Sequence, residues 1–205
     1  MHKIKSTIFV FLIYLSFSCS FAESFQEKIV AAALERTTKS VTYDGSYIAI
    51  SYPNGDVPEN IGVCTDVIIR TYRKLGIDLQ KLVHEDISEN FAKYPSKKIW
   101  GHNKPDKNID HRRVPNLEIF LSRNGATLEI TTDPKDYQAG DLVTWRLPGN
   151  LPHIGIVTDI ISADGNPMIV HNIGYGPELE DMLFAFDING HYRYEIIDNN
   201  DTESN

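Results

Sequence analysis

One cysteine stands where thiol chemistry is favoured. Cys64 follows Gly62 at the start of the segment GVCTDVIIRTYRKLG, residues 62–76, which predicts a helix that Gly76 ends. Free N–H groups and the dipole of a helix N-terminus stabilise a thiolate. The same N–H groups can hold the oxyanion that forms in acyl transfer. A nucleophilic thiol also needs a base, and the base needs an orienting partner.

Two later strand-like segments supply candidates for these roles. His153 begins HIGIVTDI, residues 153–160, and we expect its side chain to face the helix from the end of a sheet. His171 and Asn172 close PMIVHN, residues 167–172. Alternation along strands places one of these two, and not both, on the face that carries His153. The sequence thus predicts Cys64 as nucleophile, His153 as base and His171 as orienter. Asn172 is the alternative for the third role and otherwise a candidate for contact with substrate. The competing interpretation is a buried, inert cysteine and ordinary structural histidines.

The elements around these residues indicate an α+β domain, with helices first and strands after them. Ser24 and Glu27 have capping-box spacing at the start of a helix over residues 24–37, and Asp78 caps a helix that ends before Pro95. A short helix is expected over residues 116–123, after an extended stretch over 41–53 earlier in the chain. The expected strands cover residues 126–130, 141–147, 153–160, 167–172 and 191–197.

The first 22 residues have the pattern of a secretory signal. Lys3 and Lys5 precede an apolar run over residues 8–17, and small residues at Ser20 and Ala22 fit cleavage after Ala22. The run is shorter than the roughly 20 residues of a membrane span. Lipid attachment at Cys19 is the weaker alternative. Cleavage would leave Cys64 as the only cysteine, in an oxidising compartment where an unpaired thiol is exposed to oxidation. Its presence there favours a functional role for the thiol.

Composition excludes several classes of protein. The 205 residues carry 20 Lys and Arg against 28 Asp and Glu, a net charge of −8 that argues against nucleic acid as a partner. With 41% hydrophobic residues the chain can fold, and its two cysteines cannot form a disulfide framework. We expect one domain over residues 23–198, a polar and disordered tail over 199–205, and no membrane span in the mature protein. The oligomeric state is not predicted.

A polar stretch over residues 96–115 is long for a loop and indicates either function or disorder. Its Arg112 and Arg113 are candidates for binding a substrate carboxylate, because guanidinium groups pair with carboxylates in a bidentate way. Surface salt bridges in an acidic protein are the equal alternative. Asp110 and His111 make too small a set of ligands for a metal site.

A family resemblance enters with GVCTDVIIR, GDLVTW, PHIGIV and VHNIG. In this order they resemble the bacterial NlpC-type, papain-like cell-wall peptidases, in which a cysteine opens the first core helix. The segments YDGSY, YPNGDVP, GVCTDV, LVHED, PDKNIDHRRVPN and HNIGYG cover almost the whole mature chain. They resemble an exported bacterial family that is labelled a domain of unknown function and placed in the same superfamily.

The resemblance implies a papain-like fold, with N-terminal helices on a mainly antiparallel C-terminal sheet. It also implies location in the periplasm and thiol-dependent hydrolysis of an amide bond in peptidoglycan, without metal or organic cofactor. Cys64 matches the nucleophile, His153 the base and His171 the third polar position, and Tyr43 matches a tyrosine that lines the site. The chain departs from the usual Asp-Cys-Ser-Gly, because Asp66 follows the thiol closely and would raise its pKa or contact substrate.

Three functions from different classes follow. The first is a peptidoglycan hydrolase, either an endopeptidase of the stem peptide or an amidase at the link between sugar and peptide. The second is a non-catalytic cell-wall binding or scaffold protein on the same fold. The third is a thiol acyltransferase, in which an acyl-enzyme passes its acyl group to an acceptor other than water.

Overall fold

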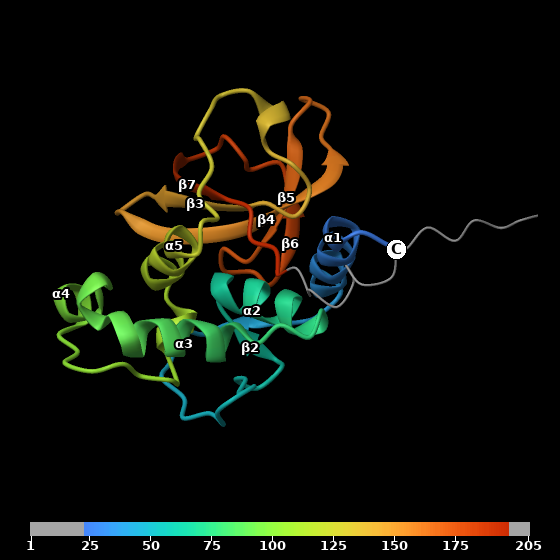
Figure 1. Cartoon of the computed structure of the whole chain (residues 1–205). Coiled ribbons are helices and arrows are strands. Elements are labelled where there is room, and N and C mark those ends of the chain that lie inside the picture. The colour runs from blue at the N-terminus through green and yellow to red at the C-terminus, as the bar shows by residue number, and fades with distance from the viewer. Residues whose placement is uncertain (1–22, 197–205) are drawn as a thin grey trace, which may run out of the picture.

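The structure, a computed structural model, describes residues 23–196 and has the expected α+β architecture (Figure 1). Within this range, no helix is long and apolar enough to cross a membrane. The predicted signal segment and C-terminal tail lie outside the described residues. The α-helices are α1 (Phe25–Arg36), α2 (Cys64–Lys74), α3 (Leu79–Asn90), α4 (Ser96–Trp100) and α5 (Val114–Arg123). The strands are β1 (Thr42–Tyr43), β2 (Ile61–Gly62), β3 (Leu142–Leu147), β4 (Leu151–Ile161), β5 (Pro167–His171), β6 (Glu178–Glu180) and β7 (Asp187–Tyr192).

Local signals in the sequence set the helix starts. The Ser24 hydroxyl accepts a hydrogen bond from the N–H of Glu27, and the Glu27 carboxylate accepts one from the N–H of Ser24, which confirms the capping box of α1. Asp78 caps α3 by accepting from the N–H of Lys81. Helix α2 begins at Cys64, as the chain leaves β2.

Five strands form an antiparallel sheet in the order β6-β5-β4-β3-β7. A separate parallel pair, β1 with β2, aligns Tyr43 with Gly62. This pair carries the chain into α2, so that Tyr43 is brought next to the segment in which Cys64 begins the helix.

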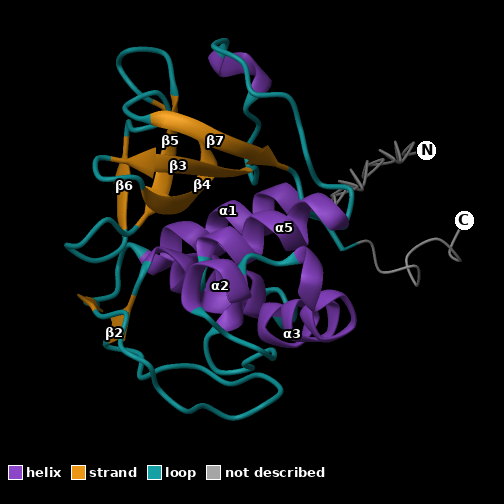
Figure 2. Cartoon of the chain, turned by 90° about the vertical axis from the view of Figure 1, so that its left-hand side faces the viewer, coloured by secondary structure: helices purple, strands orange, loops and turns teal. Residues whose placement is uncertain are grey.

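The two faces of the five-stranded sheet are covered differently. Helices α2 and α5 pack on one face together with α1 (Figures 1 and 2), where Ile154 and Ile156 of β4 join the main core. On the opposite face, Trp145, Val157 and Ile169 form a second apolar cluster with side chains from the loops that cover it. Successive β4 residues therefore face different cores.

The structure corrects several sequence-based boundaries. The stretch over 41–53 contains only the two-residue β1, and residues 126–130 make one isolated bridge, Thr127 to Tyr192, in place of a strand. The last strand begins at Asp187 and ends at Tyr192, whereas 191–197 was expected. The polar stretch over 96–115 is ordered by α4 and by a 3-10 turn at Asp110–Arg112. Strand β6 was not anticipated.

Candidate functional site

The thiol of Cys64 lies where the first turn of α2 meets strand β4. The backbone N–H groups of Ile154 and Thr65 and the hydroxyl of Tyr43 face the sulfur and favour its thiolate form. Because the Ile154 nitrogen belongs to the peptide bond that follows His153, the sulfur lies beside the backbone of the predicted base. The strand register leaves the Ile154 backbone without a partner on β5. Strand β5 ends at His171, which is opposite Gly155, so no β5 residue is paired with Ile154.

Burial keeps this thiol neutral at rest. Cys64 is 4% exposed, and burial, with a smaller effect of the Asp66 carboxylate, raises its pKa to about 11 despite the groups that favour the thiolate. Burial and the adjacent thiol raise the pKa of Tyr43 to about 12. Tyr43 remains 43% exposed, so one side of the site is open to solvent. The expected tyrosine is thus found at the thiol.

The two predicted histidines are in direct contact. Nε2 of His153 lies 3.0 Å from Nδ1 of His171, and their rings are nearly perpendicular at 88°. Nε2 of His171 lies 2.8 Å from the carboxylate oxygen Oε2 of Glu180. A continuous chain of side chains therefore runs from the edge strand β6 through β5 to His153 on β4.

His153 does not face the helix as expected. It pairs with Trp145 across β3 and β4 and lies on that residue's face of the sheet, opposite to the main core, with the two ring centroids 5.9 Å apart. Burial and the nearby His171 lower the pKa of His153 to about 3. Within residues 23–196, Nδ1 of His153 has no hydrogen-bond partner, so the imidazole and the thiol are not bonded to each other at rest. Catalytic hydrogen bonds often form only when substrate is bound.

Gly155 explains why the two histidines can meet. Its position on β4 is directly opposite His171, and a Cβ there would lie 3.1 Å from the Cβ of His171 and 2.5 Å from Cγ2 of Ile169. A larger residue would push β5 and its histidine away. The glycine in the motif His-Ile-Gly-Ile is therefore a packing requirement of the histidine pair.

Asn172 is not the third member of this chain. It lies on the other face of β5, and its side-chain oxygen accepts from the N–H groups of Gly174 and Gly176. Asn172 is fully buried. It shapes the turn after β5, which leaves His171 in the orienting position, and its predicted contact with substrate stays a prediction.

Asp66 and Arg112 form a buried ion pair, and their predicted contacts with substrate stay predictions. Nε and Nη2 of Arg112 each lie 2.9 Å from a carboxylate oxygen of Asp66, with side chains 2% and 3% exposed. Arg112 also donates to the carbonyls of Asp44 and Ser46, and Asp66 accepts from the N–H of Val63. The pair ties the segment before α5 to the start of the nucleophile helix.

Arg113 lies nearer the surface than Arg112. Its guanidinium stacks on the ring of Trp100 at 3.9 Å and approaches Nε2 of His102 at 3.1 Å. Trp100 lines a groove of about 590 Å³ together with Pro152, the residue before His153. Arg113 is thus placed behind one wall of this groove, and its predicted contact with substrate stays a prediction.

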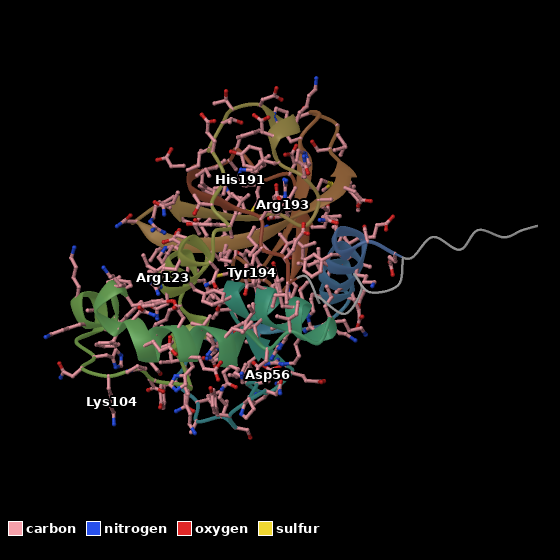
Figure 3. The ribbon with its side chains drawn as sticks, viewed as in Figure 1. Asp56, Lys104, Arg123, His191, Arg193 and Tyr194 are labelled. Carbon is pink, nitrogen blue, oxygen red and sulfur yellow. The ribbon has the colours of Figure 1, made fainter. Side chains whose placement is uncertain are left out.

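Asp141, the aspartate of the motif GDLVTW directly before β3, has a structural role. Asp141 is fully buried and accepts hydrogen bonds from Nε and Nη2 of Arg193 and from Nε2 of His191. Both partners, labelled in Figure 3, lie at the end of β7. Asp141 therefore joins the start of β3 to β7.

Glu180 is the site residue that sequence reasoning missed. It lies on a three-residue strand, and its side chain is 47% exposed. The spacing between His171 and Glu180 matches no known sequence motif. Only a prediction that residues 178–180 form a strand paired with β5 could have brought Glu180 to His171. Within residues 23–196, no three His, Cys, Asp or Glu side chains gather as a metal site would require.

Comparisons with known proteins place this chain among relatives. A protein of Escherichia coli (strain K12), described as "Uncharacterized protein YijF", is 51% identical over 168 residues, which are 82% of this chain and 81% of that one. A solved structure, "Structure of NlpC1 from Trichomonas vaginalis", aligns with 86% of this chain at 14% identity and a TM-score of 0.45. This chain spans 46% of that protein's length. The family model described as "Domain of unknown function (DUF1287)" matches residues 30–194, and the chain belongs to that family.

Proposed function

We propose that this protein is a thiol-dependent hydrolase that cleaves an amide bond in cell-wall peptidoglycan, on a papain-like fold. One observation carries the proposal: the Cys64 thiol, at the N-terminus of α2, lies beside the backbone of His153, whose ring is held by His171. A nucleophile at a helix end, a base on a neighbouring strand and an orienting group behind the base are the parts that acyl transfer requires.

The first half of the reaction forms an acyl-enzyme. The thiol attacks the carbonyl carbon and a carbon–sulfur bond forms while the carbonyl π electrons move to oxygen. The thiol proton passes to Nδ1 of His153, a transfer that requires the imidazole, which lies on the Trp145 face of the sheet at rest, to reach the sulfur when substrate is bound. The N–H of Cys64, free because it belongs to the first helical residue, is placed to donate to this oxyanion. His153 then gives the proton to the departing nitrogen as the carbon–nitrogen bond breaks.

The second half releases the acyl group. Water attacks the thioester carbon, and its proton passes to Nδ1 of His153. The carbon–sulfur bond breaks, and the same proton returns to the sulfur. The cycle begins and ends with the neutral thiol and neutral imidazole that the low exposure of Cys64 and His153 favours at rest. No cofactor takes part in the proposed steps.

The substrate class rests on sequence. The motifs around Cys64, His153 and His171 resemble those of the NlpC-type cell-wall peptidases, and the N-terminal 22 residues resemble an export signal. We therefore place the mature protein in the periplasm, starting at Glu23. The mass of the protein recovered from the periplasm tests this placement, because retention of residues 1–22 or acylation at Cys19 gives a different mass.

Product analysis tests the proposed reaction. Purified wild type, Cys64→Ala and Cys64→Ser are incubated with peptidoglycan and with soluble muropeptides, and the products are identified by mass spectrometry. New fragments from the wild type alone support the proposal, and their masses distinguish a stem-peptide endopeptidase from an amidase. Equal products from Cys64→Ala would exclude a thiol mechanism.

A non-catalytic cell-wall binding protein is the second candidate, and one observation favours it. The thiol is 4% exposed with its pKa raised to about 11, which is unusual for a free nucleophile. Wild type and Cys64→Ala would then bind peptidoglycan equally and release nothing. An acyltransferase would instead show acylation of Cys64 and transfer to an amine or alcohol acceptor, without the product of hydrolysis.

A further inference from the structure

Strand β6 presents two glutamates to the same histidine, and only one of them is bonded to it. In the register of β5 with β6, Glu178 is directly opposite His171 and Glu180 is opposite Ile169. Alternation places both carboxylates on the face of His171. Glu180 reaches diagonally to Nε2 of His171 at 2.8 Å, whereas Glu178 acts on the histidine only through its charge.

The bond to Glu180 determines where the protons are on both rings. An ionised carboxylate only accepts hydrogen bonds, so Nε2 of His171 must carry a hydrogen. Nδ1 of a neutral His171 then carries a lone pair, which can accept only from a protonated Nε2 of His153 at 3.0 Å. The remaining nitrogen of His153, Nδ1, is left with its lone pair.

From this geometry we infer that Glu180 is a positioning residue that holds His153 in the tautomer whose Nδ1 is ready to take a proton. The inference rests on the proposed function only for the identity of the proton donor, the Cys64 thiol. Without Glu180, His171 is free to protonate Nδ1 instead, which would require the opposite tautomer of His153 and place a hydrogen on the nitrogen meant to act as base. Glu180 acts through His171 and needs no contact with substrate.

Within residues 23–196, the titratable groups that act on the pair are Glu180 and Glu178 on β6 and the two histidines themselves on β4 and β5. Burial lowers the pKa of His171, and the two glutamates oppose that effect. Glu178→Gln therefore removes a nearby charge without removing the hydrogen bond, and it is the matched control for Glu180→Gln.

Tautomers can be measured without any substrate. Nitrogen NMR of the imidazole rings, in protein labelled with ¹⁵N-histidine, identifies which nitrogen carries hydrogen, and His153→Gln and His171→Asn assign the two rings among the seven histidines. We expect hydrogen on Nε2 of both rings in wild type and in Glu178→Gln. In Glu180→Gln we expect a mixture, because a carboxamide can both donate and accept. Unchanged tautomers in Glu180→Gln, or equal changes in both variants, would overturn the inference.

A double variant separates positioning from any direct effect. In His171→Asn, the amide oxygen can accept from Nε2 of His153 without help from Glu180. We expect Glu180→Gln to lower kcat roughly tenfold in the wild-type background, with KM unchanged. In the His171→Asn background it should have no further effect; a second tenfold loss there would refute action through His171. If no variant turns over peptidoglycan, the proposed function fails, whereas the tautomer result still decides the role of Glu180.

Discussion

Replacing Arg112 with methionine distinguishes a structural role of the Arg112–Asp66 pair from binding of substrate. Both side chains are almost fully buried, and two bonds of 2.9 Å join them. Methionine keeps part of the packed volume but cannot pair, so that Asp66 would be left as a buried carboxylate without its cation. Removing one partner of a buried ion pair costs about 3–5 kcal/mol of folding free energy.

Urea unfolding at pH 7, followed by circular dichroism, measures this loss. With a slope of about 2 kcal/mol per molar urea, the unfolding midpoint of Arg112→Met should fall by about 2 M. Arg113→Met is the comparison variant, because it loses a stacking contact with Trp100 and a longer, 3.7 Å ion pair with Asp110, and it should cost less, about 1–2 kcal/mol. Adding Asp66→Asn to Arg112→Met removes the unpaired charge, and the double variant should lose less than the sum of the two single losses.

The opposite pattern would refute this reasoning. If Arg112→Met unfolded within 1 kcal/mol of the wild type but raised KM for peptidoglycan fragments, Arg112 would be a substrate contact despite its burial. The N-terminus of α2 would then need another explanation for its order.

Three further predictions concern His111, Asp141 and the environment of the Cys64 thiol. Burial lowers the pKa of His111 from 6.5 to about 3, so the folded state resists protonation and stability is lost as pH falls from about 6.5 towards 3. At pH 5 this loss is about 2 kcal/mol, and urea titrations at pH 5 and 7 should show a smaller pH dependence in His111→Asn; an equal dependence would contradict it. Asp141→Asn should lower the free energy of unfolding by about 3–5 kcal/mol without changing alkylation of Cys64, and a stable variant with altered thiol reactivity would assign Asp141 to the site instead. Tyr43→Phe removes a group that favours the thiolate, so alkylation of Cys64 at pH 9, followed by peptide mass spectrometry, should slow by about threefold; an unchanged rate would show that the hydroxyl does not act on the sulfur.

Local patterns predicted the main helices and the pairing of the strands that carry His153 and His171. The capping box at Ser24 and the cap at Asp78 act within one helical turn, so the residues that make them are close in sequence. The contact of His153 with His171 followed from two neighbouring antiparallel strands and their alternation. These parts of the fold depend on short-range geometry that a sequence displays.

Other features depended on distant partners and were missed or wrong. Arg112 and Arg113 are adjacent and chemically equivalent in sequence, yet one is buried against Asp66 and the other stacks on Trp100. His153 was expected to face the helix, but the phase of β4 is set by Ile154 and Ile156, which fill the main core. Glu180 gained its role from a diagonal contact across β5 and β6, and composition gives no sign of such a contact.

Digestion of muropeptides in heavy-oxygen water tests the central claim most directly. The account predicts that wild type releases a new carboxylate carrying one heavy oxygen atom from water, whereas Cys64→Ala releases none. Release at the same rate by Cys64→Ala would contradict catalysis by this thiol. Intact substrate with both proteins, each still bound to peptidoglycan, would contradict hydrolysis and favour a binding protein.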